Sequence, residues 1–198
     1  MMRRALLALA VGGCSILPQR PYLEKREWPF VARRPAARPP RPGGRVLLVR
    51  TLSAAPGLEA RGFQRLQPDG SVQTDFYEEW SVPPADAAED SLRRWLADSG
   101  LFAAVLAPGS RARADLALEG QLTGLVAQPT AFHLSLAMVL IDLHPSPARV
   151  LAQAQIARDV PLATRDAPAI AGAANAALAE ACAAVEARIG RALAGHFG

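Results

Sequence analysis

The chain has 198 residues, of which 51% are hydrophobic, and its 22 basic and 18 acidic side chains leave a formal net charge of +4. This length and composition suit one domain with a hydrophobic core large enough to need no disulfide bonds. The sequence pI of about 9.8 is in the range of nucleic-acid-binding proteins, but so small a net charge, with much of the arginine excess before residue 46, argues against that class.

Residues 1–13 have the features of a secretory signal peptide. Two arginines, an apolar run over residues 5–11 and two glycines precede Cys14. The apolar run is too short to span a bilayer, which takes about 20 residues. A cysteine directly after small residues is typical of a lipobox, in which the thiol receives a diacylglyceryl group and the new N-terminus a fatty acid such as palmitate. We therefore predict lipidation of Cys14; the alternative is an ordinary signal peptide that ends at a cysteine.

Residues 14–44 are expected to form a Pro/Arg-rich tether. Prolines and arginines recur from Pro18 to Gly44, which favours extended polyproline II structure with little packing. Two interpretations are open: a spacer that also touches acidic lipid, or a simple unstructured leash, which we favour. Trp28 and Phe30 within it could still dock on another surface. The folded domain is then expected over residues 45–198.

The first half of that domain shows alternating strand and helix signals. Val46–Arg50 is an apolar run with strand character, and Gly62–Leu66 and Val72–Tyr77 flank a Pro-Asp-Gly turn, which predicts a hairpin with one wet face. The spacing predicts a helix from Pro84 to about Ser99, ended by Gly100. Its inward stripe consists of Ala88, Leu92, Trp95, Leu96 and Ser99. A strand over 103–106 can then return beside the first strand by a right-handed crossover.

The second half predicts a long hairpin followed by a helix. Asp115–Ala127 reads as a strand that is weakened or bulged at Gly120 and Gly124. Strict alternation in 132–140 and again in 150–156, across a Pro-Ser-Pro turn, indicates an antiparallel pair with one buried face. Apolar residues recur at helical spacing over Ala167–Ala194, with Asp166 as the N-cap. The fold class expected is therefore a single α+β domain, in which a mixed, largely antiparallel sheet packs against two main helices.

No constellation of residues points to catalysis, a metal or a cofactor. His133, His144 and His196 have no partner at metal-ligand spacing. Asp142 and His144 could start an acid-base pair, but a solvated polar pair at the mouth of a turn is the favoured explanation. The chain has neither a nucleophile elbow nor a phosphate-binding loop. Once Cys14 is lipidated, Cys182 has no disulfide partner, and its Ala-rich surroundings indicate a small core residue.

Apolar surface is what remains as a candidate for binding. Tyr77 and Trp80, in the run Tyr77-Glu78-Glu79-Trp80, are the candidate contacts for a partner or for lipid. Trp80 is either an interface hot spot or a staple between sheet and helix, and the second interpretation is favoured. The phenylalanines at 63, 76 and 102 are assigned to the core.

These features together resemble the ABC-type transport auxiliary lipoproteins, including the PqiC-like components of paraquat-inducible and MCE-type lipid transport systems. The resemblance covers nearly the whole chain. Its spacer after Tyr22-Leu23 is longer and more basic than the family pattern. The stretches that carry the resemblance are the lipobox ending at Cys14, Tyr22-Leu23, Val46 to Val49, Pro56-Gly57-Leu58, Arg61-Gly62, Tyr77 to Trp80, Pro83-Pro84, and Leu96 to Phe102 followed by Val105.

The resemblance implies a cell-envelope lipoprotein that faces the periplasm and supports an ABC transporter without catalysis. The implied partners are MCE-family membrane-anchored subunits, the ABC permease and ATPase of the same system, and phospholipid; the oligomeric state stays open. Because Ser15 and not aspartate follows Cys14, the usual sorting rule favours the outer membrane. The expected role is to dock an MCE-type conduit at the outer membrane or to receive lipid from it. The alternatives are a general envelope scaffold without lipid handling, and a periplasmic hydrolase that would need a deep polar pocket.

Overall fold

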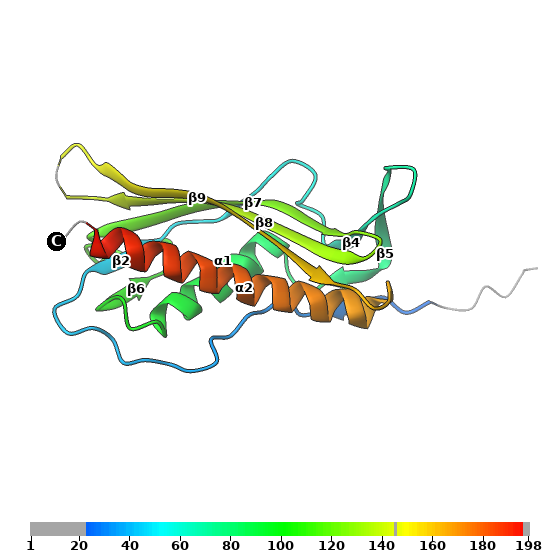
Figure 1. Ribbon diagram of the computed structural model, residues 1–198, viewed down its shortest axis with the longest axis horizontal. Helices are drawn as coiled ribbons and strands as arrows, with labels where there is room; N and C mark the ends of the chain where they lie inside the picture. Colours follow the sequence, from blue (N-terminus) through cyan, green and yellow to red (C-terminus); the bar gives the residue numbers. More distant parts are fainter. Residues whose placement is uncertain (1–22, 145, 196–198) are drawn as a thin grey trace, which may run out of the picture.

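The computed structural model describes residues 23–144 and 146–195. The predicted signal peptide over 1–13, the lipidation site Cys14 and the residues Ser15, Tyr22 and His196 lie outside the described residues. Within the described ranges, nine strands form one mixed sheet, and two helices lie together on one side of it (Figure 1). The strands are β1 (Arg26–Trp28), β2 (Val46–Val49), β3 (Ser53–Ala54), β4 (Gly62–Leu66), β5 (Val72–Trp80), β6 (Ala104–Leu106), β7 (Leu116–Ala127), β8 (Ala131–Asp142) and β9 (Arg149–Pro161). The helices are α1 (Pro84–Ala97) and α2 (Ala167–Ala194).

Strand β7 organises the sheet. One edge pairs with β8 in an antiparallel ladder from Leu116 to Ala127, and β8 in turn pairs with β9. The other edge of β7 is met in succession by β2, β3 and β4, all parallel to it. β6 extends this edge beside β2, while β5 and then β1 extend it beside β4. The predicted mixed sheet and the crossover that returns β6 beside β2 are thus confirmed.

Helix α2 packs on the hairpin of β8 and β9, which is the most extensive contact between a helix and the sheet. The sequence predicted this helix and both strands. Every second residue of β8, from Phe132 to Asp142, is buried. The N-cap Asp166 accepts a hydrogen bond from the backbone N of Ala169 at 2.9 Å, which satisfies one of the free amides at the start of α2. Helix α2 is long and apolar enough to cross a membrane by length and composition alone. Its apolar face instead packs on the sheet, where Ala174, Leu178 and Cys182 are fully buried.

The two glycines of β7 serve different purposes. The register with β8 shifts between Leu122 and Gly124, so the predicted bulge exists at the second glycine. At Gly120 the pairing is regular, but a Cβ atom there would lie 2.5 Å from the sulfur of Met138 and 2.6 Å from Cδ1 of Leu52. Gly120 therefore permits close packing of the core and is not a bulge.

The tether predicted up to residue 44 is wrong from β1 onward, since β1 already belongs to the sheet. We call residues 29–45 the strap, because they run along both helices between β1 and β2 (Figure 1). Phe30 and Ala32 are each only 3% exposed. The backbone N of Val31 donates to Oδ1 of Asn175 on α2 at 2.9 Å, and the backbone N of Ala32 donates to Oγ of Ser91 on α1 at 3.2 Å. The prolines prevent a helix in the strap, but they do not prevent burial of the alternate residues Phe30 and Ala32, while residues 35–43 stay exposed.

An ion pair holds the middle of the strap. Arg34 donates from Nε and Nη2 to the two carboxylate oxygens of Glu186 on α2, both at 3.1 Å, and Nε1 of Trp95 on α1 donates to the same carboxylate at 2.7 Å. Burial by itself would raise the pKa of Glu186, but the hydrogen bonds from Arg34 and Trp95 outweigh it, so this pKa lies below its ordinary value. Glu186 thus joins the strap and both helices at one point.

The C-terminal part of the strap lies against the end of α1. The backbone N of Arg38 donates to the carbonyl of Asp98, and that of Arg41 to the carbonyl of Phe102, both at 2.9 Å. Gly100 lies between these contacts with a φ of +73°, and a Cβ atom there would lie 3.0 Å from Cβ of Arg38. Glycine at this position therefore ends α1 and also makes room for the strap.

Replacing Phe30 by alanine should lower the free energy of unfolding by about 3–5 kcal/mol, because a buried ring is removed and leaves a cavity. Urea unfolding of the purified protein measures this change. The matched control is Leu23→Ala, since Leu23 is 59% exposed and its loss should change stability by less than about 0.5 kcal/mol. If both variants are equally harmless, the strap is not part of the folded body.

Glu186→Gln should destabilise the protein at neutral pH by about 1–3 kcal/mol, because the guanidinium of Arg34 loses its charged acceptor. The folded-state pKa of Glu186 lies below the unfolded one, so its stabilisation is present above the unfolded pKa and is lost as pH falls through the folded pKa. The gap between wild type and variant in urea midpoint should therefore close in acid. Glu180→Gln, on the same helix but with a side chain that is 57% exposed, should show no comparable gap at either pH.

Candidate functional site

Two adjacent carboxylates of β5 hold the incoming chain on the sheet. Glu78 accepts hydrogen bonds from Arg26 and, at 2.7 Å, from Nε1 of Trp28. Glu79 accepts from Nζ of Lys25 and from Nη2 of Arg61, both at 2.6 Å. The hydrogen bond from Lys25 is the main reason why the pKa of Glu79 is lowered. The carboxylates thus fix β1 beside β5, in parallel register with Arg26 opposite Glu78.

Trp80 cannot serve as a partner contact in this structure, and this part of the prediction is wrong. The residue is only 2% exposed, and its ring lies 4.2 Å from that of Phe63 and 5.1 Å from that of Phe30, centroid to centroid. Arg61 also donates from Nε to the backbone carbonyl of Trp80 at 2.8 Å. Trp80 is therefore a core residue that packs the sheet against a neighbouring element, as the favoured interpretation proposed. That element is the strap, through Phe30, and not a helix.

Tyr77 and its neighbour Phe76 form an exposed aromatic pair. Tyr77 is 42% and Phe76 is 72% exposed, so the assignment of Phe76 to the core is wrong. The two rings pack edge to face with centroids 5.1 Å apart, and Nζ of Lys25 lies 5.3 Å from the centroid of Phe76. We call Phe76, Tyr77 and the aliphatic chain of Lys25 the aromatic patch.

A bulge in β5 explains this exposure. Between the paired positions Gly62–Glu79 and Gln64–Thr74, β4 advances two residues while β5 advances five. The extra residues, which include Phe76 and Tyr77, have no register partner on β4. A Cβ atom at Gly62 would lie 2.2 Å from the carbonyl oxygen of Asp75, so the bulge needs glycine at this place on β4. The alternation that predicted one buried face of β5 is wrong from the start of the strand, because Val72 and Thr74, which precede the bulge, are exposed as well as Phe76.

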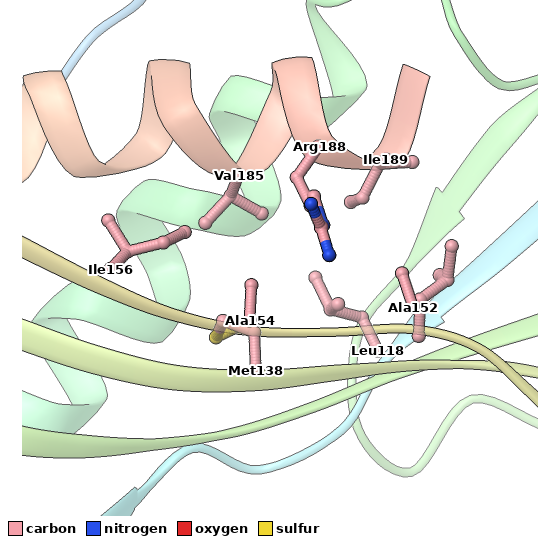
Figure 2. A pocket seen from close by; sticks show the side chains of 9 residues that line it. Leu118, Met138, Ala152, Ala154, Ile156, Val185, Arg188 and Ile189 are labelled. Atoms are coloured by element: carbon pink, nitrogen blue, oxygen red, sulfur yellow. The ribbon is translucent and has the colours of Figure 1, made fainter. Parts of the chain in front are cut away.

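An apolar crevice separates the second half of α2 from the sheet (Figure 2). Val185 and Ile189 on α2 face Met138, Ala154 and Ile156 on the strands. Arg188 is its one charged lining residue, and Nη2 of Arg188 donates to the backbone carbonyl of Gln153 at 3.3 Å. Its volume is about 10 Å³, which is room for about one water molecule. The crevice therefore cannot hold an acyl chain in this conformation.

Two larger hollows lie between the strap and α2. One, of about 640 Å³, is lined by Arg34, Arg38, Trp95 and neighbouring residues of α2; the other, of about 480 Å³, is lined by Arg41, Gly43, Arg45, Leu101 and the end of α2. Both are open to solvent and combine arginine side chains with an apolar floor. Volumes of this order fit a small ligand or one part of a lipid.

The residues considered for catalysis do not form a site. The backbone N of His144, and not its ring, donates to Oδ1 of Asp142 at 3.1 Å, while the ring lies 3.7 Å from Asp115. Asp142 is buried and ion-paired with Arg45. Burial alone would raise the pKa of Asp142, but the hydrogen bond from Arg45 and that from His144 lower it overall. Asp142 is thus a structural carboxylate, and in the part of the chain that the structure describes no three His, Cys, Asp or Glu residues gather at metal-binding distance.

Comparison with known proteins identifies relatives in sequence and structure. The family model for the ABC-type transport auxiliary lipoprotein component matches residues 30–186. A DUF330-family protein from Xanthomonas campestris is 27% identical, with a TM-score of 0.64 over 78% of this chain and 87% of that chain. An uncharacterized protein has the same TM-score at 12% identity, over 83% of this chain and 99% of that chain. A hypothetical protein from Chlamydia trachomatis reaches 0.50 at 11% identity, over 74% and 98%. No curated protein matches this sequence.

Cys182 should be inert in the folded protein, because the residue is fully buried and burial raises the pKa of its thiol to about 12. A colorimetric thiol reagent should detect no thiol in the detergent-solubilised protein and one thiol in guanidinium chloride. A thiol that reacts in the folded state and persists in a Cys182→Ala variant belongs to Cys14, and it would contradict lipidation. One that disappears in this variant would contradict the burial of Cys182.

Proposed function

This chain belongs to the ABC-type transport auxiliary lipoprotein family, and so is a cell-envelope lipoprotein with a transport-associated role. On this basis we propose that it is the outer-membrane docking component of an MCE-type lipid transport system. Cys14 carries the lipid anchor. The folded body meets the MCE subunits, which connect it to the permease and ATPase of the same system. Ser15, which follows the anchor, supports the outer membrane as its location.

The observation that carries this proposal is the short reach of the anchor. The chain is fixed to the body from β1 onward, and twelve peptide steps separate Cys14 from Arg26 at the start of β1. Twelve residues span about 40 Å at most when fully extended. A tether that ended at residue 44 would allow about twice that distance at about 3 Å per residue. The body is therefore held close to its membrane, which suits a fixed docking point better than a carrier that crosses the periplasm.

The hollows of the body support docking rather than the storage of a whole lipid. The crevice under α2 has room for about one water molecule, and the two hollows beside the strap are open to solvent. The head group of a phospholipid could bind the arginines that line these two hollows, but the open hollows do not enclose its acyl chains. The body thus offers contacts to a lipid in transit and depends on partner subunits to shield it.

Purification through a C-terminal tag tests this proposal, since α2 ends far from β1 along the molecule (Figure 1). From membranes solubilised in mild detergent, the wild-type protein should recover MCE subunits and phospholipid. Cys14→Ala should lose them, because this variant becomes soluble in the periplasm or stays as uncleaved precursor. Mass spectrometry of the mature N-terminus should show the diacylglyceryl and acyl groups on Cys14.

Two results would contradict the proposal. A wild-type preparation that carries the lipid anchor but recovers neither MCE subunits nor phospholipid would favour the general envelope scaffold. An unmodified Cys14 thiol in a processed N-terminus would remove the anchor, and with it the docking role.

A further inference from the structure

We infer that the aromatic patch is a second membrane contact, which inserts into the head-group region of the same leaflet that holds the anchor at Cys14. The inference rests on the proposed lipidation of Cys14 and deepens it, because a single flexible anchor holds the body near the bilayer without orienting it. With the aromatic patch as a second contact besides the anchor at Cys14, the body would be held in one orientation on the bilayer.

The position of the patch is the first argument. β1 runs parallel to β5 with Arg26 opposite Glu78, so Lys25 lies beside Phe76 and the chain leaves the body directly at the patch. From there to Cys14 the chain reaches about 40 Å at most. The anchor therefore brings this end of the body, rather than the end with the β8–β9 turn, to the bilayer (Figure 1).

The chemistry of the patch is the second argument. A phenylalanine that is 72% exposed keeps most of its apolar ring in water, which is unfavourable in proportion to the apolar area left unburied. Tyrosine and lysine with apolar bodies and polar tips are the side chains that settle at the boundary between acyl chains and head groups. Leu23, 59% exposed and two residues before Lys25, adds an aliphatic side chain on the path to the anchor.

The charges around the patch indicate which force drives the contact. Lys25, Arg26 and Arg61 are balanced by Glu27, Glu78 and Glu79 through the ion pairs of this end. The carboxylates of Glu78 and Glu79 lie beneath these cations, with side chains only 13% and 12% exposed, so they do not face anionic head groups. The six ion-paired charges cancel, and the exposed Glu24 adds one negative charge, so attraction to anionic head groups does not drive the contact. Insertion should therefore depend on the rings and should persist in about 1 M salt, where the Debye length falls to about 3 Å.

A fluorophore placed next to the patch tests the inference in the full-length lipidated protein. Thr74 is exposed on β5 two residues before Phe76, so Thr74→Cys accepts an environment-sensitive label and leaves both rings in place. Cys182 is fully buried and takes no label. The control is Val150→Cys, since Val150 is 56% exposed on β9 near the β8–β9 turn at the other end of the molecule.

In vesicles of phosphatidylethanolamine and phosphatidylglycerol, the emission of the label at 74 should shift to shorter wavelength. Lipids brominated on the upper acyl chain should quench it, in high salt as well. The label at 150 should show neither effect. Adding Phe76→Ser to Thr74→Cys should remove most of the shift and quenching, whereas Phe76→Trp should preserve them. Since Phe76 is largely exposed, both substitutions should leave the urea midpoint unchanged.

The remaining outcomes overturn the inference in distinguishable ways. If the protein floats with the vesicles but the label at 74 stays in water, the anchor stands and the second contact does not exist. If the label is shielded but brominated lipid does not quench it, a second copy or another protein covers the patch. If the protein does not float at all, Cys14 carries no anchor, and both the inference and the proposed function fail.

Discussion

The carboxylate of Glu186 is the interaction on which the arrangement of this molecule depends. It accepts hydrogen bonds from Arg34 in the strap and from Trp95 in α1 while belonging to α2 itself. A partly buried carboxylate with these partners is costly to leave unpaired, so the three elements are held together or lost together. The pairing converts a stretch rich in proline and arginine into part of the folded body. Together with Glu78 and Glu79, which hold β1 on β5, it moves the first fixed residue of the chain from the predicted Arg45 back to β1.

With the proposed anchor at Cys14, this shift gives the body a membrane-near end and a far end. β1, the bulge of β5 and the exposed rings lie where the chain comes from Cys14, while the β8–β9 turn and the end of α2 lie at the opposite end of the molecule (Figure 1). The family is that of the ABC-type transport auxiliary lipoproteins, and the proposed anchor at Cys14 would give such a protein a fixed orientation. A compact body held within a few tens of ångströms of its bilayer would present one fixed surface to its partners.

The run Tyr77-Glu78-Glu79-Trp80 shows how neighbouring side chains acquire unrelated roles. Tyr77 lies exposed in the bulge, Glu78 and Glu79 hold β1 through cations, and Trp80 packs against Phe30 and Phe63 in the core. The sequence pattern marked the run as a candidate contact without separating these roles. The separation depends on three extra residues of β5 and on the close approach that Gly62 permits, neither of which has a signature in strand alternation.

The sequence by itself determined the elements whose residues repeat with a regular period. The alternation of β8 and β9, the helical spacing and N-cap of α2, and the turn residues of the β4–β5 hairpin all predict local structure, because local backbone geometry decides which side chains share a face. The alternation of Trp28, Phe30 and Ala32 was a weaker signal of the same kind, hidden by the prolines around it. Only the tertiary structure decided that Phe30 and Ala32 of the strap are buried, that Trp80 is inside and that Phe76 is outside. Those outcomes depend on partners far away in the sequence, such as Asn175, Ser91 and Glu186 for the strap, and no local period encodes them.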